Sequence, residues 1–137
     1  MRGDVPVAST DRFALVVEDS DDIARLVQLM LRRMNIESAH AANGFAALAF
    51  LEERLPDLVL LDINMPGMNG WQVLETIKER HAQADFPVIV LTALNDPTNR
   101  LIGKLQPQVF CYVTKPFELD ALALAVREAL GLTPGEG

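Results

Sequence analysis

Four short runs of consecutive apolar residues constrain the fold of this chain more than any other feature of its sequence. Each run has the length of a β-strand and ends abruptly at polar residues; the runs are Phe13–Val17, Leu58–Leu61, Val88–Leu91 and Val109–Val113. A weaker fifth strand, Ile36–Ala41, fits between the first two helical segments. Runs that are apolar on both faces are typical of a parallel sheet covered by helices, and not of an antiparallel sheet with one wet face.

Segments with the apolar spacing of helices alternate with these runs. In the clearest segment, apolar residues recur at intervals of three and four, which places them on one helix face: Ile23, Leu26, Val27, Met30, Leu31 and Met34. Ser20 precedes this segment as a predicted N-cap. Four further helices are predicted, starting at Asn43-Gly44, at Asn69 or Gly70, at Asp96-Pro97 and at Leu119. Five strands alternating with five helices predict a doubly wound α/β domain with right-handed crossovers.

Length and charge limit the number of domains and the class of partner. The 137 residues fit one compact domain; we expect it over residues 12–131, between a flexible N-terminal segment 1–11 and a C-terminal tail 132–137. The net charge of −7 opposes binding to a phosphate backbone, so we do not expect direct nucleic acid binding. We find neither the pattern of a signal peptide nor an apolar run long enough to span a membrane. We therefore expect a cytoplasmic protein without a membrane partner.

Polar side chains stand where the apolar runs end: Glu18, Asp19, Asp62, Thr92 and Lys115. Ligands of doubly wound domains bind at the carboxyl ends of the strands, so we expect these five side chains to share one edge of the sheet. Three carboxylates repel one another unless a lysine or a divalent cation compensates their charge. Mg²⁺ suits this set, because it accepts one or two carboxylates and completes its shell with water and phosphate oxygens. Each residue also has a structural alternative in a cap or a turn, but five compatible residues at four strand ends together favour a site.

Other binding patterns are absent from the sequence. It contains neither the P-loop nor the glycine pattern of a dinucleotide site, so nucleotide binding has no support. His40 and His81 are isolated in the sequence, and we expect each to be a surface histidine or a hydrogen-bonded structural one.

Four motifs in the sequence resemble the signatures of response regulator receiver domains. They are Val-Val-Glu-Asp-Ser, Leu-Leu-Asp-Ile-Asn-Met-Pro-Gly-Met-Asn-Gly, Val-Leu-Thr-Ala and Tyr-Val-Thr-Lys-Pro-Phe, and the match runs from Phe13 to Leu130. The resemblance implies a five-stranded flavodoxin-like (βα)5 fold with strand order 2-1-3-4-5. It also implies a stand-alone, single-domain response regulator of a two-component phosphorelay.

The resemblance implies that Asp62 accepts a phosphoryl group from the phosphohistidine of a sensor histidine kinase or a histidine phosphotransfer protein. Asp19, Asp62 and the backbone carbonyl of Asn64 are then expected to hold Mg²⁺, with Glu18 acting through water. Lys115 is expected to pair with a phosphoryl oxygen from the other side. A carboxylate is a weak nucleophile towards a charged phosphoryl group, so alignment and charge neutralisation must supply the catalysis.

The resemblance also implies a conformational switch that is read by a downstream protein target. Thr92 is the expected switch hydroxyl, and Tyr112 is the aromatic residue whose rotamer follows it. The Lys115–Pro116 peptide bond is expected to be cis. The expected readout is the face formed by the fourth helix, the fifth strand and the fifth helix. Members of the family occur as monomers or pair through this face, so a homodimer is one expectation.

The sequence departs from the family pattern at several places. Glu18 stands where many members have aspartate, and the segment Gly103–Gln108 replaces a common Gly-Ala before the fifth strand. Pro107 predicts an early end of the fourth helix. Leu94 offers no polar group to orient an attacking water, so slow loss of the phosphoryl group is expected. Residues 109–115 are faintly similar to the fifth strand of small regulators paired with phytochrome-type kinases.

Two other functions compete with this interpretation. The chain is expected to catalyse only its own phosphorylation and slow dephosphorylation, and not to act as an enzyme on a separate substrate. One alternative is a receiver-like interaction module that works without phosphorylation. The other is a Mg²⁺-dependent phosphohydrolase with an aspartyl nucleophile. Such enzymes usually carry a second acid two residues after the nucleophile, where this chain has Asn64.

Overall fold

A five-stranded parallel sheet forms the centre of the computed structural model, which describes residues 12–93 and 108–132. The strands lie in the order β2-β1-β3-β4-β5; they are β1 (Phe13–Val17), β2 (Glu37–Ala41), β3 (Leu58–Asp62), β4 (Val88–Ala93) and β5 (Val109–Lys115). All four neighbouring pairs are parallel. The predicted fold class and strand order are confirmed. Three strands extend further than their apolar runs, so Asp62, Thr92 and Lys115 lie within strands and not beyond them.

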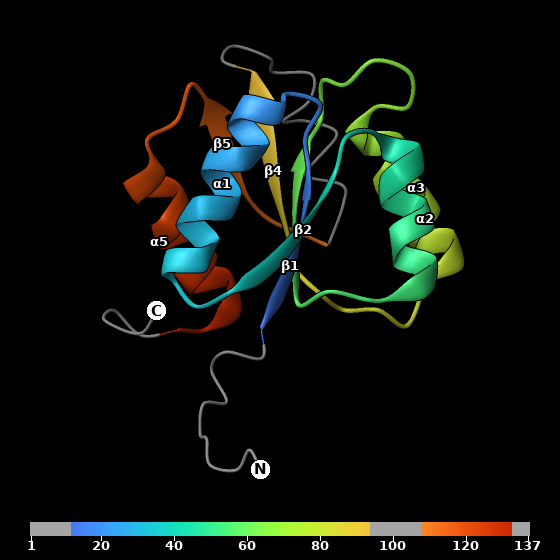
Figure 1. Ribbon diagram of the computed structural model, residues 1–137. Helices are drawn as coiled ribbons and strands as arrows, with labels where there is room; N and C mark the ends of the chain where they lie inside the picture. Colours follow the sequence, from blue (N-terminus) through green and yellow to red (C-terminus); the bar gives the residue numbers. More distant parts are fainter. Residues whose placement is uncertain (1–11, 94–107, 133–137) are drawn as a thin grey trace.

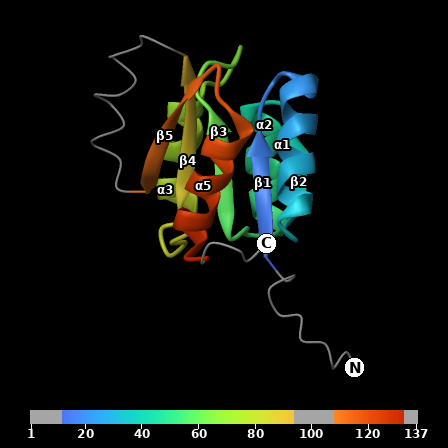
Figure 2. The ribbon, with the colours of Figure 1, turned by 90° about the vertical axis from the view of Figure 1, so that its left-hand side faces the viewer.

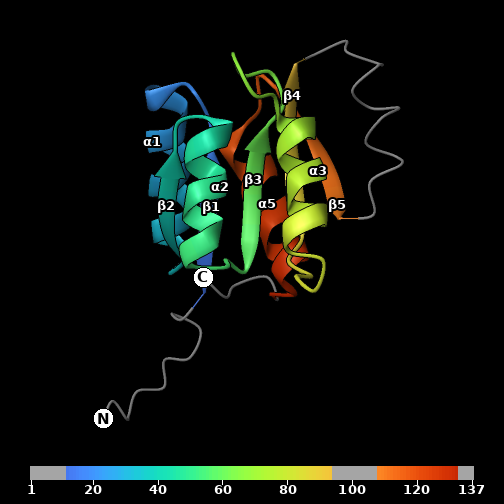
Figure 3. The same ribbon diagram turned by 90° about the vertical axis from the view of Figure 1, so that its right-hand side faces the viewer.

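Two pairs of helices cover the two faces of this sheet (Figure 1). Helices α1 (Asp21–Arg33) and α5 (Leu119–Leu130) lie on one face (Figure 2), and α2 (Gly44–Glu53) and α3 (Gly70–Arg80) lie on the other (Figure 3). Successive strand residues point to opposite faces, so Val16 packs in the core under α1 and α5, whereas Val17 packs in the core under α2 and α3. No helix in the described part of the chain is long and apolar enough to cross a membrane.

Several predictions concern parts of the chain outside the described residues. The fourth helix predicted from Asp96-Pro97, its early end at Pro107 and the role of Leu94 all fall on residues 94–107. The expected N-terminal segment 1–11 and residues 133–137 of the expected tail also lie outside the described residues.

Side-chain caps start three of the helices at the carboxyl edge of the sheet. Ser20 accepts the N–H of Ile23 at the start of α1, and Asn43 accepts the N–H of Ala46 at the start of α2. Asn69 forms a capping box with Gln72 at the start of α3. These caps fix the loops that follow β1, β2 and β3.

Gly70 brings the start of α3 against the end of β3. A Cβ atom at this position would lie 2.5 Å from Cδ1 of Ile63 and 2.8 Å from the backbone oxygen of Asp62. Only a residue without a side chain fits so close to the backbone, so the helix begins in direct contact with the strand that carries Asp62.

The pairing of β5 with β4 contains one irregularity. Val88 is opposite Val109, but Ile89 is opposite Cys111, so Phe110 is an extra residue in β5. After this bulge the register is regular, with Tyr112 opposite Val90 and Lys115 opposite Ala93. Because one residue of slippage moves side chains to the other face of a sheet, the bulge determines which face each residue of β5 presents.

Candidate functional site

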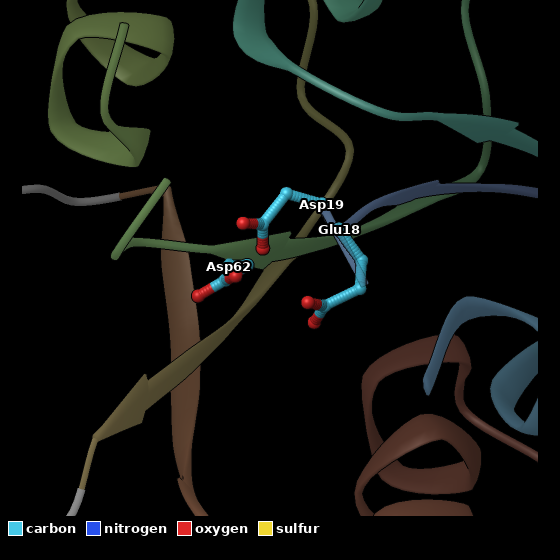
Figure 4. A group of neighbouring side chains, drawn as sticks. All are labelled: Glu18, Asp19 and Asp62. Carbon is cyan, nitrogen blue, oxygen red and sulfur yellow. The ribbon is translucent and has the colours of Figure 1, made fainter. Parts of the chain in front are cut away.

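Three carboxylates gather at the carboxyl ends of β1 and β3, two adjacent interior strands of the sheet (Figure 4). Glu18 and Asp19 follow β1, and Asp62 is the last residue of β3. One carboxylate oxygen from each residue lies within 4.8 Å of the others. Glu18 and Asp62 are 0% and 1% exposed, whereas Asp19 is exposed. The structure therefore brings together the three acids that the strand ends predicted to share one edge, with one of them open to solvent.

Lys115 supplies positive charge to this cluster from the end of β5. Its Nζ lies 3.2 Å from Oδ2 of Asp62 and 3.0 Å from Oε1 of Glu18. Nζ also donates to Oε2 of Glu18 at 3.3 Å. Burial lowers the pKa of Lys115, but its bonds to Glu18 and Asp62 outweigh this effect and raise the pKa above its ordinary value. The amine is therefore charged. The Lys115–Pro116 peptide bond is cis, as the sequence predicts.

The carboxyl group of Asp62 has a strongly raised pKa. Burial and the nearby charge of Glu18 raise the pKa of Asp62 from 3.8 to about 7. Lys115 and the backbone N–H of Asn64, which donates to Oδ1 at 3.0 Å, act in the opposite direction without cancelling the rise. Lys115 therefore does not fully offset the burial of Asp62 and the charge of Glu18.

This excess of negative charge and the closely spaced oxygens fit a hard divalent cation such as Mg²⁺. The carboxylates of Asp19 and Asp62 are best placed for such an ion, because Asp19 is open to solvent and Asp62 lies next to it. Both oxygens of Glu18 face Lys115, and Oε2 also accepts the N–H of Ser20 at 3.1 Å. Glu18 is therefore engaged by Lys115 and by the backbone of Ser20.

We expect stabilisation by Mg²⁺ to depend on pH. Because the pKa of Asp62 in the folded chain exceeds its ordinary value, this carboxyl favours folding at low pH, and that contribution is lost as the pH rises through about 7. Mg²⁺ requires the ionised carboxylate, so it should stabilise the chain by roughly 1 kcal/mol more at about pH 8 than at about pH 6. Denaturant unfolding with and without Mg²⁺ measures the difference, and an equal effect at both pH values would contradict the prediction.

Thr92 and Tyr112 lie on the adjacent strands β4 and β5. Thr92 is 1% exposed, and its Oγ1 has no hydrogen-bond partner among the described residues. Tyr112 is half-buried and packs against the core under α2 and α3, the same face as its register partner Val90. Thr92 follows Val90 by two residues, so Thr92 and Tyr112 face the same side of the sheet.

Comparison with known proteins identifies the family. The response regulator receiver domain family matches residues 14–127. The chain is 36% identical over 116 residues to the DNA-binding response regulator MtrA of Mycolicibacterium smegmatis, an alignment that covers 85% of the chain and 49% of MtrA. It is also 36% identical over 118 residues to the regulatory protein AtoC of Escherichia coli, covering 86% of the chain and 25% of AtoC.

The chain belongs to the response regulator receiver domain family. A solved receiver domain structure, a CheY-like protein from Methanospirillum hungatei, has a TM-score of 0.78 and 30% identity, covering 87% of the chain and 94% of that structure. The chain spans about half the length of MtrA and about a quarter of AtoC. Membership of this family places the chain in two-component signalling.

One polar contact of this receiver domain was missed by the sequence analysis. Nε2 of His40 lies 2.7 Å from the backbone oxygen of Glu18. His40 is opposite Val16 in the β1–β2 register, near the end of both strands. The contact depends on the register of β2 against β1. The sequence does not reveal this register, because β2 is the strand with the weakest sequence pattern.

Proposed function

We propose that this receiver domain is a phosphoacceptor switch. In this proposal Asp62 accepts the phosphoryl group from the phosphohistidine of a sensor histidine kinase or histidine phosphotransfer protein, and the change is read by a protein partner. The observation that supports it best is the surroundings of the buried Asp62 carboxylate. Lys115 forms an ion pair with it, and the exposed carboxylate of Asp19 lies close to it. Receiver domains as a family are phosphoacceptors, which agrees with this geometry.

In the proposed transfer, a bond forms between a carboxylate oxygen of Asp62 and phosphorus, and the phosphorus–nitrogen bond of phosphohistidine breaks. Mg²⁺, when bound by Asp19, Asp62 and the backbone carbonyl of Asn64, supplies positive charge that offsets the charge of the phosphoryl oxygens. Lys115 is already placed 3.2 Å from Asp62 and pairs with a further phosphoryl oxygen. The N–H of Asn64 holds Oδ1 of Asp62 and so fixes the rotation of the carboxylate.

We propose that Thr92 couples this chemistry to the surface. Its buried hydroxyl lacks a hydrogen-bond partner among the described residues, and a phosphoryl oxygen on Asp62 offers one. A ligand shifts a conformational equilibrium only when it interacts better with one state, and this hydrogen bond supplies such a difference. Tyr112, on the same face of the neighbouring strand, carries the change towards β5 and α5.

We expect the Thr92→Val variant to be stable but unable to switch. Valine has nearly the shape of threonine without the unpartnered hydroxyl, so the variant should be more stable by about 1 kcal/mol. Beryllofluoride, a phosphoryl mimic, should change amide hydrogen exchange in β5 and α5 of the wild-type chain but not of the variant.

Thr76→Val is the matched control for this experiment. The Thr76 hydroxyl donates to the backbone oxygen of Gln72 within α3, away from the carboxylates. An exchange response in Thr92→Val equal to that of Thr76→Val would contradict the proposed role of Thr92.

The phosphoacceptor proposal is tested by labelling with acetyl phosphate, with and without Mg²⁺. We expect one phosphoryl group per chain, located by proteolysis and mass spectrometry on the peptide that contains Asp62, and none in the presence of a chelator. A label on another peptide, or labelling that persists in the presence of the chelator, would overturn the phosphoacceptor proposal. Equal affinity for a protein partner with and without beryllofluoride would favour the phosphorylation-independent alternative.

We propose a protein, and not nucleic acid, as the direct partner of these residues. The net charge of −7 opposes a phosphate backbone. The DNA-binding activity in the name of MtrA refers to a protein about twice as long as the aligned region. Fluorescence anisotropy with a DNA duplex measures this directly, and salt-sensitive binding by the chain itself would contradict the proposal.

A further inference from the structure

A histidine side chain on β2 contacts the backbone of the acidic loop. His40 lies one residue before the end of β2, and its Nε2 is 2.7 Å from the carbonyl oxygen of Glu18. A carbonyl oxygen can only accept a hydrogen bond, so Nε2 must carry a proton and act as the donor. The contact therefore defines which ring nitrogen of His40 is protonated.

This hydrogen bond continues the β1–β2 pairing beyond the last strand residues. The N–H of Glu18 donates to the backbone oxygen of Ala41 at 3.1 Å, so β2 holds the backbone of Glu18 at its N–H through Ala41 and at its carbonyl through His40. β2 itself is tied to α1, because Gln28 donates to the Ser38 hydroxyl at 3.1 Å. His40 thus connects the acidic loop to a fixed part of the fold.

The carbonyl that His40 holds belongs to the peptide group between Glu18 and Asp19. The ψ angle of Glu18 sets both the direction of this carbonyl and the position of Asp19 relative to Glu18, and the side chains of both residues belong to the three-carboxylate cluster. Glu18 has to face Lys115, while Asp19 has to face Asp62, so the two neighbouring residues need one defined peptide orientation. A donor on this carbonyl supplies that constraint without contacting the metal or the phosphoryl group.

We infer that His40 is a positioning residue, which orients the Glu18–Asp19 peptide group for binding of Mg²⁺ and for phosphorylation of Asp62. The inference rests on the proposed phosphoacceptor function. It adds a residue from β2, a strand that contributes none of the carboxylates. The competing interpretation is that the hydrogen bond stabilises the fold and leaves the site unchanged.

The test compares three variants of the full chain in their affinity for Mg²⁺ alone, measured by calorimetry. His40→Leu removes the donor, and we expect it to weaken Mg²⁺ binding by about 10-fold, the lower end of the effect of losing an outer-shell partner. Glutamine places an amide nitrogen near the position of Nε2, so His40→Gln should stay within about 3-fold of the wild-type affinity. The control His81→Leu alters the histidine that ends α3, far from the carboxyl edge, and should leave the affinity unchanged.

A spectroscopic measurement on the wild-type chain covers the case in which His40→Leu fails to fold. The chain has two histidines, so a sample labelled with ¹⁵N-histidine gives two sets of ring signals. Addition of Mg²⁺ should shift the Nε2–H signal of His40 and leave His81 unchanged. Ring signals of His40 that do not respond to saturating Mg²⁺ would overturn the inference.

Unchanged Mg²⁺ affinity in His40→Leu, together with the same loss of unfolding free energy in the presence and absence of Mg²⁺, would also overturn it. That result differs from a failure of the phosphoacceptor proposal. If only the inference about His40 fails, the wild-type chain is still labelled on Asp62. If the phosphoacceptor proposal fails, the wild-type chain is not labelled on Asp62 at all. Loss of affinity in both His40→Leu and His40→Gln would also contradict the inference, because the restored donor should rescue binding.

Discussion

The Asp62→Asn variant is expected to lose labelling by acetyl phosphate by at least about 10³-fold, as expected when a nucleophile is removed. The amide has no charged oxygen to attack phosphorus, but it keeps the shape of the side chain. Its oxygen can still accept the N–H of Asn64, so the loop after β3 has no reason to move. The measurement is the fraction of phosphorylated protein by intact mass spectrometry after a fixed time in Mg²⁺ buffer.

The matched control for this variant is Asp85→Asn. Asp85 is exposed and lies before β4, at the opposite end of the sheet from the carboxylates, so labelling should equal that of the wild-type chain. Equal labelling of Asp62→Asn and Asp85→Asn would remove Asp62 from its proposed role.

Unfolding of the variant would not explain the loss of labelling. Asparagine removes a buried carboxyl whose pKa is about 7, so at about pH 8 without metal it removes a charge that opposes folding. The Asp62→Asn variant should therefore be more stable than the wild-type chain under these conditions, by about 2 kcal/mol. Denaturant unfolding of both proteins checks the sign of the difference.

The Lys115→Met variant has the second large expected effect. It removes the only amine that contacts Glu18 and Asp62 among the described residues and leaves both carboxylates buried. Removing one partner of a buried ion pair should cost about 3 kcal/mol of unfolding free energy at about pH 8 without metal. Methionine keeps most of the length of the lysine, so the loss reports charge more than volume.

Mg²⁺ should recover a large part of this stability, because it becomes the remaining source of positive charge in the cluster. Labelling should fall by about 10²-fold even with Mg²⁺ bound, since one charged contact to the phosphoryl group is missing. Lys78→Met, on the exposed surface of α3, is the control and should change neither quantity. Stability of Lys115→Met equal to that of the control would contradict the described ion pairs.

The sequence is most informative where the chain is buried on both sides. The apolar runs that become β1, β3 and β4 are fully buried apart from the last residue of β4, so nearly every position in them had to be apolar. β2 is an edge strand of mixed burial, and its sequence pattern is correspondingly weak. The acids and the lysine could be found because each interrupts an apolar run at the point where the strands end.

Other features of the site depend on three-dimensional details that the sequence does not encode locally. Glu18 and Asp19 are adjacent acids, yet one is fully buried and the other is exposed, because the chain turns between them after β1. The contact of His40 with Glu18 depends on the register of β2 against β1. The pairing of Lys115 with Glu18 spans 97 positions of the chain, and a local pattern cannot contain it.

The bulge at Phe110 has a consequence for how the chain tolerates changes of length. It lies between the segment that enters β5 and the part of β5 that carries Tyr112 and Lys115. An added or lost residue before Cys111 can be accommodated by enlarging or closing this bulge, while the pairing of residues 111–115 with β4 stays the same. A change of one residue in the connection into β5 is therefore expected to leave the lysine in place.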